Sequence, residues 1–317
     1  MYLNRLSLTG FQKQDILSRL KILNDYCDNS ESLTEGEISF IKIAIPELIC
    51  ILPTCVYPVS SFKLPFERLV INEIICGKNK RLKSLTDLRY PPRKKLPNLD
   101  YNRTSLKGQA IFYAGSKGKL TLAFETQPQK GQLITISKWI QTSGPINMTV
   151  ICQDASLAMS NPDELLHYYN HYERLLNQLE TNTQEVVIAI FRFIIKAFTR
   201  EVDPKNKKGY LFSALLSNMF FNSSENPCDA IYYPSVPCDG SAMNIAIKPD
   251  VLDKHFEMIE ANEVVVDESH NKNKWLTFDS AICKSYNKDT LELNWENKFM
   301  TDIDRTRAII EYKIDFT

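Results

Sequence analysis

Residues 110–152 of this chain carry the pattern that most restricts its fold. Short apolar runs rich in β-branched residues, at 133–136 and 148–152, are separated by Gly131 and by Gly144-Pro145. Such runs between turn residues are typical of strands. Helical patterns stand on both sides of them, and no internal repeat is visible. A chain in which groups of strands follow groups of helices in this way predicts an α+β fold.

Helical signals precede and follow these strands. Apolar residues recur at helical spacing over 11–24, and Thr34 with Glu37 three residues later is a capping-box pattern. Further helices are expected at 162–180, 185–200 and 210–221 and from Asp250, and the acid-rich segment 253–268 is expected to be an exposed helix face. Strands are expected at 110–113, 120–124, 230–233, 244–247, 264–266 and 309–314. Prolines between residues 46 and 65 indicate a boundary near residue 60, which separates a helical extension, 1–60, from a main domain, 61–317.

Charge and cysteine content restrict the partners. The 38 Lys and Arg residues balance 38 Asp and Glu residues, so direct nucleic-acid binding by the chain as a whole is not expected. Positive charge is concentrated in 78–95, which is either a solvated loop or a phosphate-attracting rim. The 8 Cys include no Cys-x-x-Cys pair, the start lacks a secretory pattern, and the most apolar run, 186–198, is too short to span a bilayer. We therefore expect a cytoplasmic protein without a membrane segment.

Three polar residues stand where an apolar scaffold could present them to a ligand. Arg103 precedes a predicted strand, and its planar fork could hold two oxygens of a diphosphate, although many loop arginines are simply exposed. Glu125 closes an apolar run, where an acid must be exposed, paired or in a cleft. Ser235 follows Tyr-Tyr-Pro at a strand end and lacks a Gly-x-Ser-x-Gly elbow, so we expect it to bind a ligand rather than to act as a triad nucleophile.

Other motifs are less specific. Tyr113 is either a core aromatic or a ring that stacks on a ligand. His167 and His171 share one face of a predicted helix, but a third ligand is missing, so we expect an aromatic helix surface and no metal site. The chain has no Walker loop and no Gly-x-Gly-x-x-Gly motif, which argues against a phosphate-binding loop and a Rossmann cofactor site.

The order of these residues resembles the RES-domain family over residues 62–266. The matching segments are Pro91-Pro92, the loop 103–108, Tyr113, Glu125, Ser235 and the later Asn244-Ile245-Ala246. The early arginine of the family is best matched by Arg68, because it precedes the proline pair, and Arg89 is the rival.

The resemblance implies an ADP-ribosyltransferase-like fold, with a mixed β-sheet core and helices, and an enzyme that consumes NAD+ as its substrate without a separate cofactor. It implies that Arg68 and Arg103 hold the diphosphate, Tyr113 stacks on nicotinamide, Glu125 stabilises an oxocarbenium-like state, Ser235 positions the ribose, and Asn244 helps to bind substrate. It also implies a toxin-like role beside an Xre-type antitoxin with a helix-turn-helix.

Several acceptors for the ADP-ribose group are compatible with the sequence. Cleavage by inorganic phosphate to ADP-ribose 1-phosphate is favoured over cleavage by water, because the sequence offers no obvious general base beside Glu125. The alternatives are NAD+ hydrolysis, ADP-ribosylation of a macromolecule that the basic stretch recruits, and a nucleotide-binding module without activity.

Overall fold

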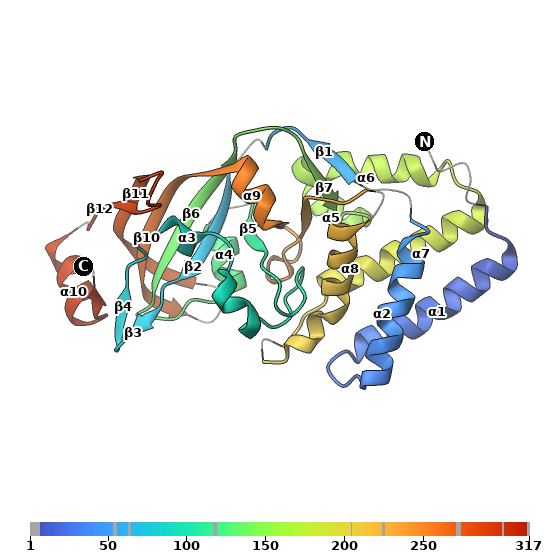
Figure 1. Ribbon diagram of the computed structural model, residues 1–317, viewed down its shortest axis with the longest axis horizontal. Helices are drawn as coiled ribbons and strands as arrows, with labels where there is room; N and C mark the ends of the chain where they lie inside the picture. The colour runs from blue at the N-terminus through green and yellow to red at the C-terminus, as the bar shows by residue number, and fades with distance from the viewer. Residues whose placement is uncertain are drawn as a thin grey trace. The chain divides into compact units, whose positions relative to one another are not determined.

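The computed structural model describes residues 7–52, 56–62, 65–116, 119–203, 205–223, 226–270, 274–299 and 301–315. The chain forms two compact units, each assembled from several segments of the sequence (Figure 1). Unit 1 contains Met1–Val59, Lys94–Ile111 and Ile146–Ser241, and unit 2 contains Ser60–Arg93, Phe112–Pro145 and Ala242–Thr317. Each unit combines helices with strands, so the predicted α+β class is confirmed.

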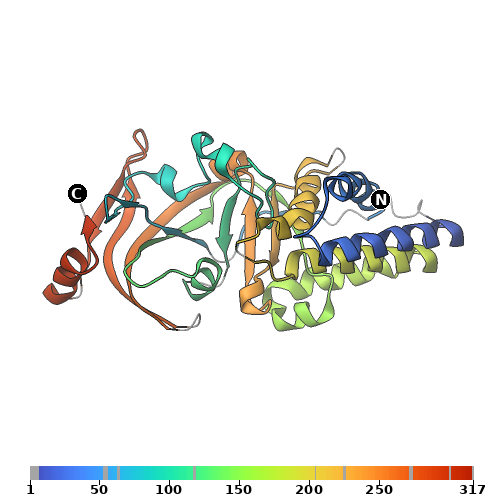
Figure 2. The ribbon, with the colours of Figure 1, turned by 90° about the horizontal axis from the view of Figure 1, so that it is seen from below.

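Helices dominate unit 1. They are α1 (Gly10–Asp28), α2 (Glu35–Ile49), α5 (Ala155–Ser160), α6 (Pro162–Leu176), α7 (Thr181–Thr199) and α8 (Leu211–Asn222). The predicted capping box is present, because the Thr34 hydroxyl accepts from the Glu37 amide at 3.3 Å and the Glu37 carboxylate accepts from the Thr34 amide at 2.7 Å. Helices α1 and α7 lie side by side (Figure 2). Within the described ranges, no helix is both long enough and apolar enough to cross a membrane.

A small sheet completes unit 1. Strand β1 (Val56–Val59) pairs antiparallel with β7 (Ile146–Val150), and β7 pairs in parallel with β8 (Ala230–Pro234). Strand β8 ends immediately before Ser235, as the proline at its end predicts. Unit 1 also contains the short 3-10 helices η3 (Lys207–Tyr210) and η4 (Val236–Cys238). Residues 94–98 of a further 3-10 helix, η2 (Arg93–Asn98), belong to it as well.

Unit 2 is built on an antiparallel sheet with the strand order β9-β5-β2-β6-β10-β11-β12. The strands are β9 (Met243–Ile247), β5 (Phe112–Gly115), β2 (Phe66–Ile71), β6 (Leu133–Gln141), β10 (Phe256–His270), β11 (Lys274–Tyr286) and β12 (Leu293–Asn297). A second sheet joins β3 (Ile74–Ile75), β4 (Lys78–Lys80) and β13 (Ile314–Asp315). The helices are α3 (Leu85–Leu88), α4 (Lys119–Thr126), α9 (Pro249–His255) and α10 (Asp302–Ile310).

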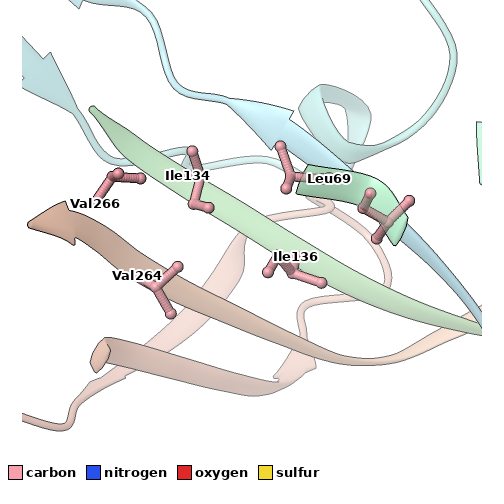
Figure 3. Close-up of a cluster of buried hydrophobic side chains, with 6 residues drawn as sticks. Leu69, Ile134, Ile136, Val264 and Val266 are labelled. Atoms are coloured by element: carbon pink, nitrogen blue, oxygen red, sulfur yellow. The ribbon is translucent and has the colours of Figure 1, made fainter. Parts of the chain in front are cut away.

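Apolar side chains are buried on both faces of the sheet of unit 2. On one face, Leu122 of α4 joins a buried cluster with residues of β2, β6 and β10, most of which Figure 3 labels. The cluster consists of Leu69, Leu122, Ile134, Ile136, Val264 and Val266. On the other face, Leu133 and Val265 pack with Ala308 of α10. Because successive strand residues point to opposite faces, each neighbouring pair such as Ile134 and Leu133 contributes to both layers.

Three of the predicted elements are wrong. Residues 119–126 form helix α4 instead of a strand, and Leu122 of this helix packs on the sheet in a buried cluster. The acid-rich segment is strand β10 from Phe256 onward, because its β-branched run is buried and its acids pair across the sheet. Residues 302–310 form helix α10, so the strand expected at 309–314 begins only at Ile314.

A buried ion pair fastens the far part of this sheet. The side chains of Arg81 and Glu263 are 8% and 0% exposed, and Arg81 donates from Nε and Nη2 to Glu263 Oε1 at 3.1 and 2.8 Å. Ser280 donates to the same carboxylate oxygen at 2.6 Å, and Arg81 Nη1 donates to Asn297 Oδ1 at 3.0 Å. The Arg81 guanidinium lies 5.6 Å from the Trp295 ring centroid. The segment after β4 is thereby held to β10, β11 and β12.

We predict that Arg81→Met lowers the free energy of unfolding by about 3–5 kcal/mol, because it leaves the carboxylate of Glu263 buried without its cation. Chemical denaturation followed by circular dichroism measures this change. The exposed pair of Arg19 and Glu47, 2.6 Å apart, gives the control, and Arg19→Met should cost less than about 1 kcal/mol. Equal losses for the two variants would refute a special role for the buried pair.

Candidate functional site

The amide of Asn244 and the carboxylate of Glu125 form the centre of the candidate site. Asn244 lies on β9 and Glu125 on α4, and Asn244 Nδ2 donates to Glu125 Oε1 at 2.7 Å. Tyr113 and Gly115 of β5 pair with Ala246 and Asn244. Because residues two apart on a strand share a face, Tyr113 and Asn244 lie on the same face of the sheet. The fold of unit 2 thus brings together three of the predicted site residues.

The two hydrogen-bonded residues differ in exposure. Asn244 is 8% exposed, whereas Glu125 is exposed on its helix. The buried amide therefore orients a carboxylate that solvent and ligands can reach. A carboxylate held in this way can accept hydrogen bonds from sugar hydroxyls or stabilise positive charge that develops beside it.

Gly115 allows α4 to approach the sheet closely at this site. A Cβ atom at position 115 would lie 3.2 Å from Leu122 Cδ2 and 3.8 Å from Asn244 Oδ1. The glycine therefore helps to set the distance between α4 and β5, and with it the position of Glu125. Gly115 was not among the predicted site residues, although a glycine that ends an apolar strand is a known sign of close approach.

A row of charged residues leads across the sheet to Asn244. In the register of neighbouring strands, Glu260 lies opposite Lys138, and Lys138 lies opposite Glu67. Glu67 in turn lies opposite Gly115, and Gly115 lies opposite Asn244. Lys138 Nζ lies 3.0 Å from Glu260 Oε1, and this hydrogen bond is the main cause of the lowered pKa of Glu260. The row depends on the register of five strands, so no local sequence signal could have revealed it.

Arg68 faces away from Asn244 and Glu125. Its neighbour Leu69 packs with Leu122 under α4, so Arg68 points to the opposite face of the sheet. There its Nη1 donates to the Tyr113 carbonyl at 2.8 Å, and its guanidinium lies 5.2 Å from the Phe112 ring centroid. Its Nε is buried without a hydrogen-bond partner among the residues described. Burial lowers the pKa of Arg68 to about 10, so the side chain stays charged at neutral pH.

Arg103 and Ser235 belong to unit 1. Arg103 Nη1 donates to the carbonyls of Phe198 and Arg200 at 2.7 and 3.2 Å, and it thereby satisfies the carboxyl end of α7. Its guanidinium lies 5.0 Å from the Tyr210 ring centroid. Ser235 follows β8 and is 0% exposed. In this structure Arg103 supports a helix end, and a diphosphate would have to engage its other guanidinium nitrogens.

The rival early arginine, Arg89, lies on a different part of unit 2. Its Nη1 is 3.3 Å from Asp253 Oδ1, and Tyr90 donates to the same carboxylate at 2.5 Å. Burial and the hydrogen bond to Asp253 raise the pKa of Tyr90 to about 12. Arg89 therefore helps to hold α9 against the segment that follows α3.

The two histidines of α6 contact aromatic rings. His171 lies 5.4 Å from Tyr57 and His167 lies 5.6 Å from Tyr168, measured between ring centroids. Burial is the main cause of the lowered pKa of His171. In the part of the chain that the structure describes, no three His, Cys, Asp or Glu side chains are grouped so that they could hold a metal ion.

Comparison with known proteins gave no relative: no protein-family model matches the chain, and no curated protein matches it.

We predict that Gly115→Val lowers the free energy of unfolding by about 1–3 kcal/mol, because the added atoms press on Leu122 and force α4 away from the sheet. Thermal unfolding measures the loss. Gly36→Ala is the control, because a Cβ atom there meets nothing within 4 Å and alanine favours the helix in which it lies. Unchanged stability of Gly115→Val would contradict close packing at this position.

Proposed function

We propose that this protein cleaves the bond between nicotinamide and ribose in NAD+ and transfers the ADP-ribose group to inorganic phosphate. The observation that carries the proposal is the 2.7 Å hydrogen bond between Asn244 and Glu125, which are 119 positions apart and were assigned to one site from their order in the sequence. The position of Tyr113 on the same sheet face supports it further. A toxin-like role beside an Xre-type antitoxin belongs to the same proposal and rests on the family resemblance.

In this proposal Glu125 acts on the reacting sugar. As the bond between the anomeric carbon and the nicotinamide nitrogen breaks, nicotinamide leaves as a neutral molecule and the ribose acquires positive charge. The carboxylate of Glu125, oriented by Asn244, stabilises this charge. Tyr113 offers its ring to the nicotinamide. A phosphate oxygen then forms the new bond to the anomeric carbon and gives ADP-ribose 1-phosphate.

The arginines take different parts. Because Arg68 lies on the sheet face opposite Glu125, we assign it to hold the Tyr113 backbone rather than to contact the diphosphate. That Arg103 holds the diphosphate rests on the family resemblance alone, and its Nη1 donates to the carbonyls at the end of α7 in unit 1.

We predict that Glu125→Gln lowers NAD+ turnover by at least ~100-fold with the fold intact, because glutamine can still accept the Asn244 hydrogen bond but carries no charge to stabilise the transition state. Release of nicotinamide, followed by chromatography, measures the rate. Glu47→Gln, on the exposed surface of α2, is the matched control and should retain the wild-type rate. Near wild-type turnover of Glu125→Gln would remove Glu125 from the reaction.

The acceptor is tested separately. We predict that added phosphate raises the rate of NAD+ loss at least ~10-fold over phosphate-free buffer and that ADP-ribose 1-phosphate is the product, because a phosphate dianion needs no general base. Mass spectrometry identifies the product. A rate indifferent to phosphate, with ADP-ribose as product, would establish a glycohydrolase instead, and label transferred from NAD+ to another macromolecule would establish an ADP-ribosyltransferase.

A further inference from the structure

Unit 1 carries a concentrated positive surface. We call it the cationic surface and define it as residues 94–108 and 205–210. The two segments contain seven cations and a single acid, Asp100. The cations are Lys94, Lys95, Arg103, Lys107, Lys205, Lys207 and Lys208. The acids Glu201 and Asp203 lie just before the second segment, so the wider region still has an excess of positive charge.

The two segments form one surface. Lys107 Nζ lies 3.2 Å from Asp100 Oδ1, and the Gly108 amide donates to the Leu99 carbonyl at 3.1 Å, which closes the loop onto η2. Burial raises the pKa of Asp100, but the Tyr101 amide, Lys107 and Lys207 outweigh it and lower this pKa overall. The two segments are also in contact, because the Arg103 guanidinium of the first lies over the ring of Tyr210 in the second.

Three of the cations are held in place by rings. Lys107 Nζ lies 5.1 Å from the Tyr101 ring centroid, Lys207 Nζ lies 5.4 Å from that of Tyr210, and the Arg103 guanidinium lies 5.0 Å from the same Tyr210 ring. Cations that are already positioned lose less side-chain freedom when an anion binds. A surface of this kind suits a ligand that carries several negative charges.

The chemistry of the surface favours nucleic acid over a lipid or protein partner. The large hydrophobic side chains that are exposed in the described structure all lie outside the two segments, so the surface offers no apolar anchor for a bilayer or for the centre of a protein interface. What it offers is a concentration of lysine and arginine, the side chains that neutralise the phosphates of a nucleic-acid backbone. We propose that the cationic surface binds single-stranded nucleic acid through its phosphodiester backbone. The balanced net charge of the chain does not oppose this, because the positive charge is local.

Fluorescence anisotropy with a labelled 20-nucleotide single-stranded RNA of mixed sequence tests the proposal. We expect wild-type binding at low salt, and binding about 10-fold or more weaker for Lys107→Ala/Lys207→Ala. The slope of log K against log salt should become shallower by about 1.4, since two phosphate contacts are lost. The matched control is Lys78→Ala/Lys83→Ala, which removes the same charge from exposed lysines of unit 2 and should change affinity less than about 2-fold.

Three results would overturn the proposal. They are no binding of the RNA by the wild-type protein at 50 mM salt, equal losses for the two double variants, and competition by polyglutamate as effective as competition by unlabelled RNA. The last result would show that the cationic surface binds acidic proteins instead. Circular dichroism spectra and melting temperatures of both double variants confirm that a loss of binding reflects lost charge and not unfolding. NAD+ turnover is not needed for any of these measurements.

Discussion

The packing of Leu122 on the sheet of unit 2 is the contact on which the candidate site depends. Leu122 packs with Leu69, Ile134 and Ile136 in one buried cluster and lies against Gly115, so burial of apolar surface fixes α4 over β2 and β5. Three residues along the same helix, Glu125 then emerges where Asn244 can reach it. A hydrophobic contact thereby decides where a charged group is placed.

The alternation of side chains in this sheet separates two kinds of polar residue. On the face of α4, Glu125 and the row from Glu260 to Glu67 remain close to solvent or to each other. On the opposite face, Arg68 and Glu263 are enclosed, and the cost of burying their charge is offset by hydrogen bonds and ring contacts. The first set is available for chemistry, and the second stabilises the fold.

The predicted site residues therefore acquire distinct roles. Asn244, Glu125 and Tyr113 share a sheet face, which supports the proposed reaction at a sugar. Arg103 satisfies the carbonyl groups at the end of α7 in unit 1, a structural task that any loop arginine near a helix end can perform. The cationic surface around it is an independent feature, because six of its seven cations are lysines.

The sequence by itself determined the elements whose signals are local. The capping box of Thr34, the helix start at Pro162 and the strand that ends before Ser235 depend on residues only a few positions apart, and all three were predicted. Tertiary structure decided the rest: that 119–126 is a helix, that Phe256–His270 is a strand, and that Arg68 turns away from Glu125. Each of these outcomes depends on strand register and on burial against residues distant in sequence. The intrinsic preference of these residues for helix or strand amounts to less free energy than such contacts contribute, so the local sequence could not determine these outcomes.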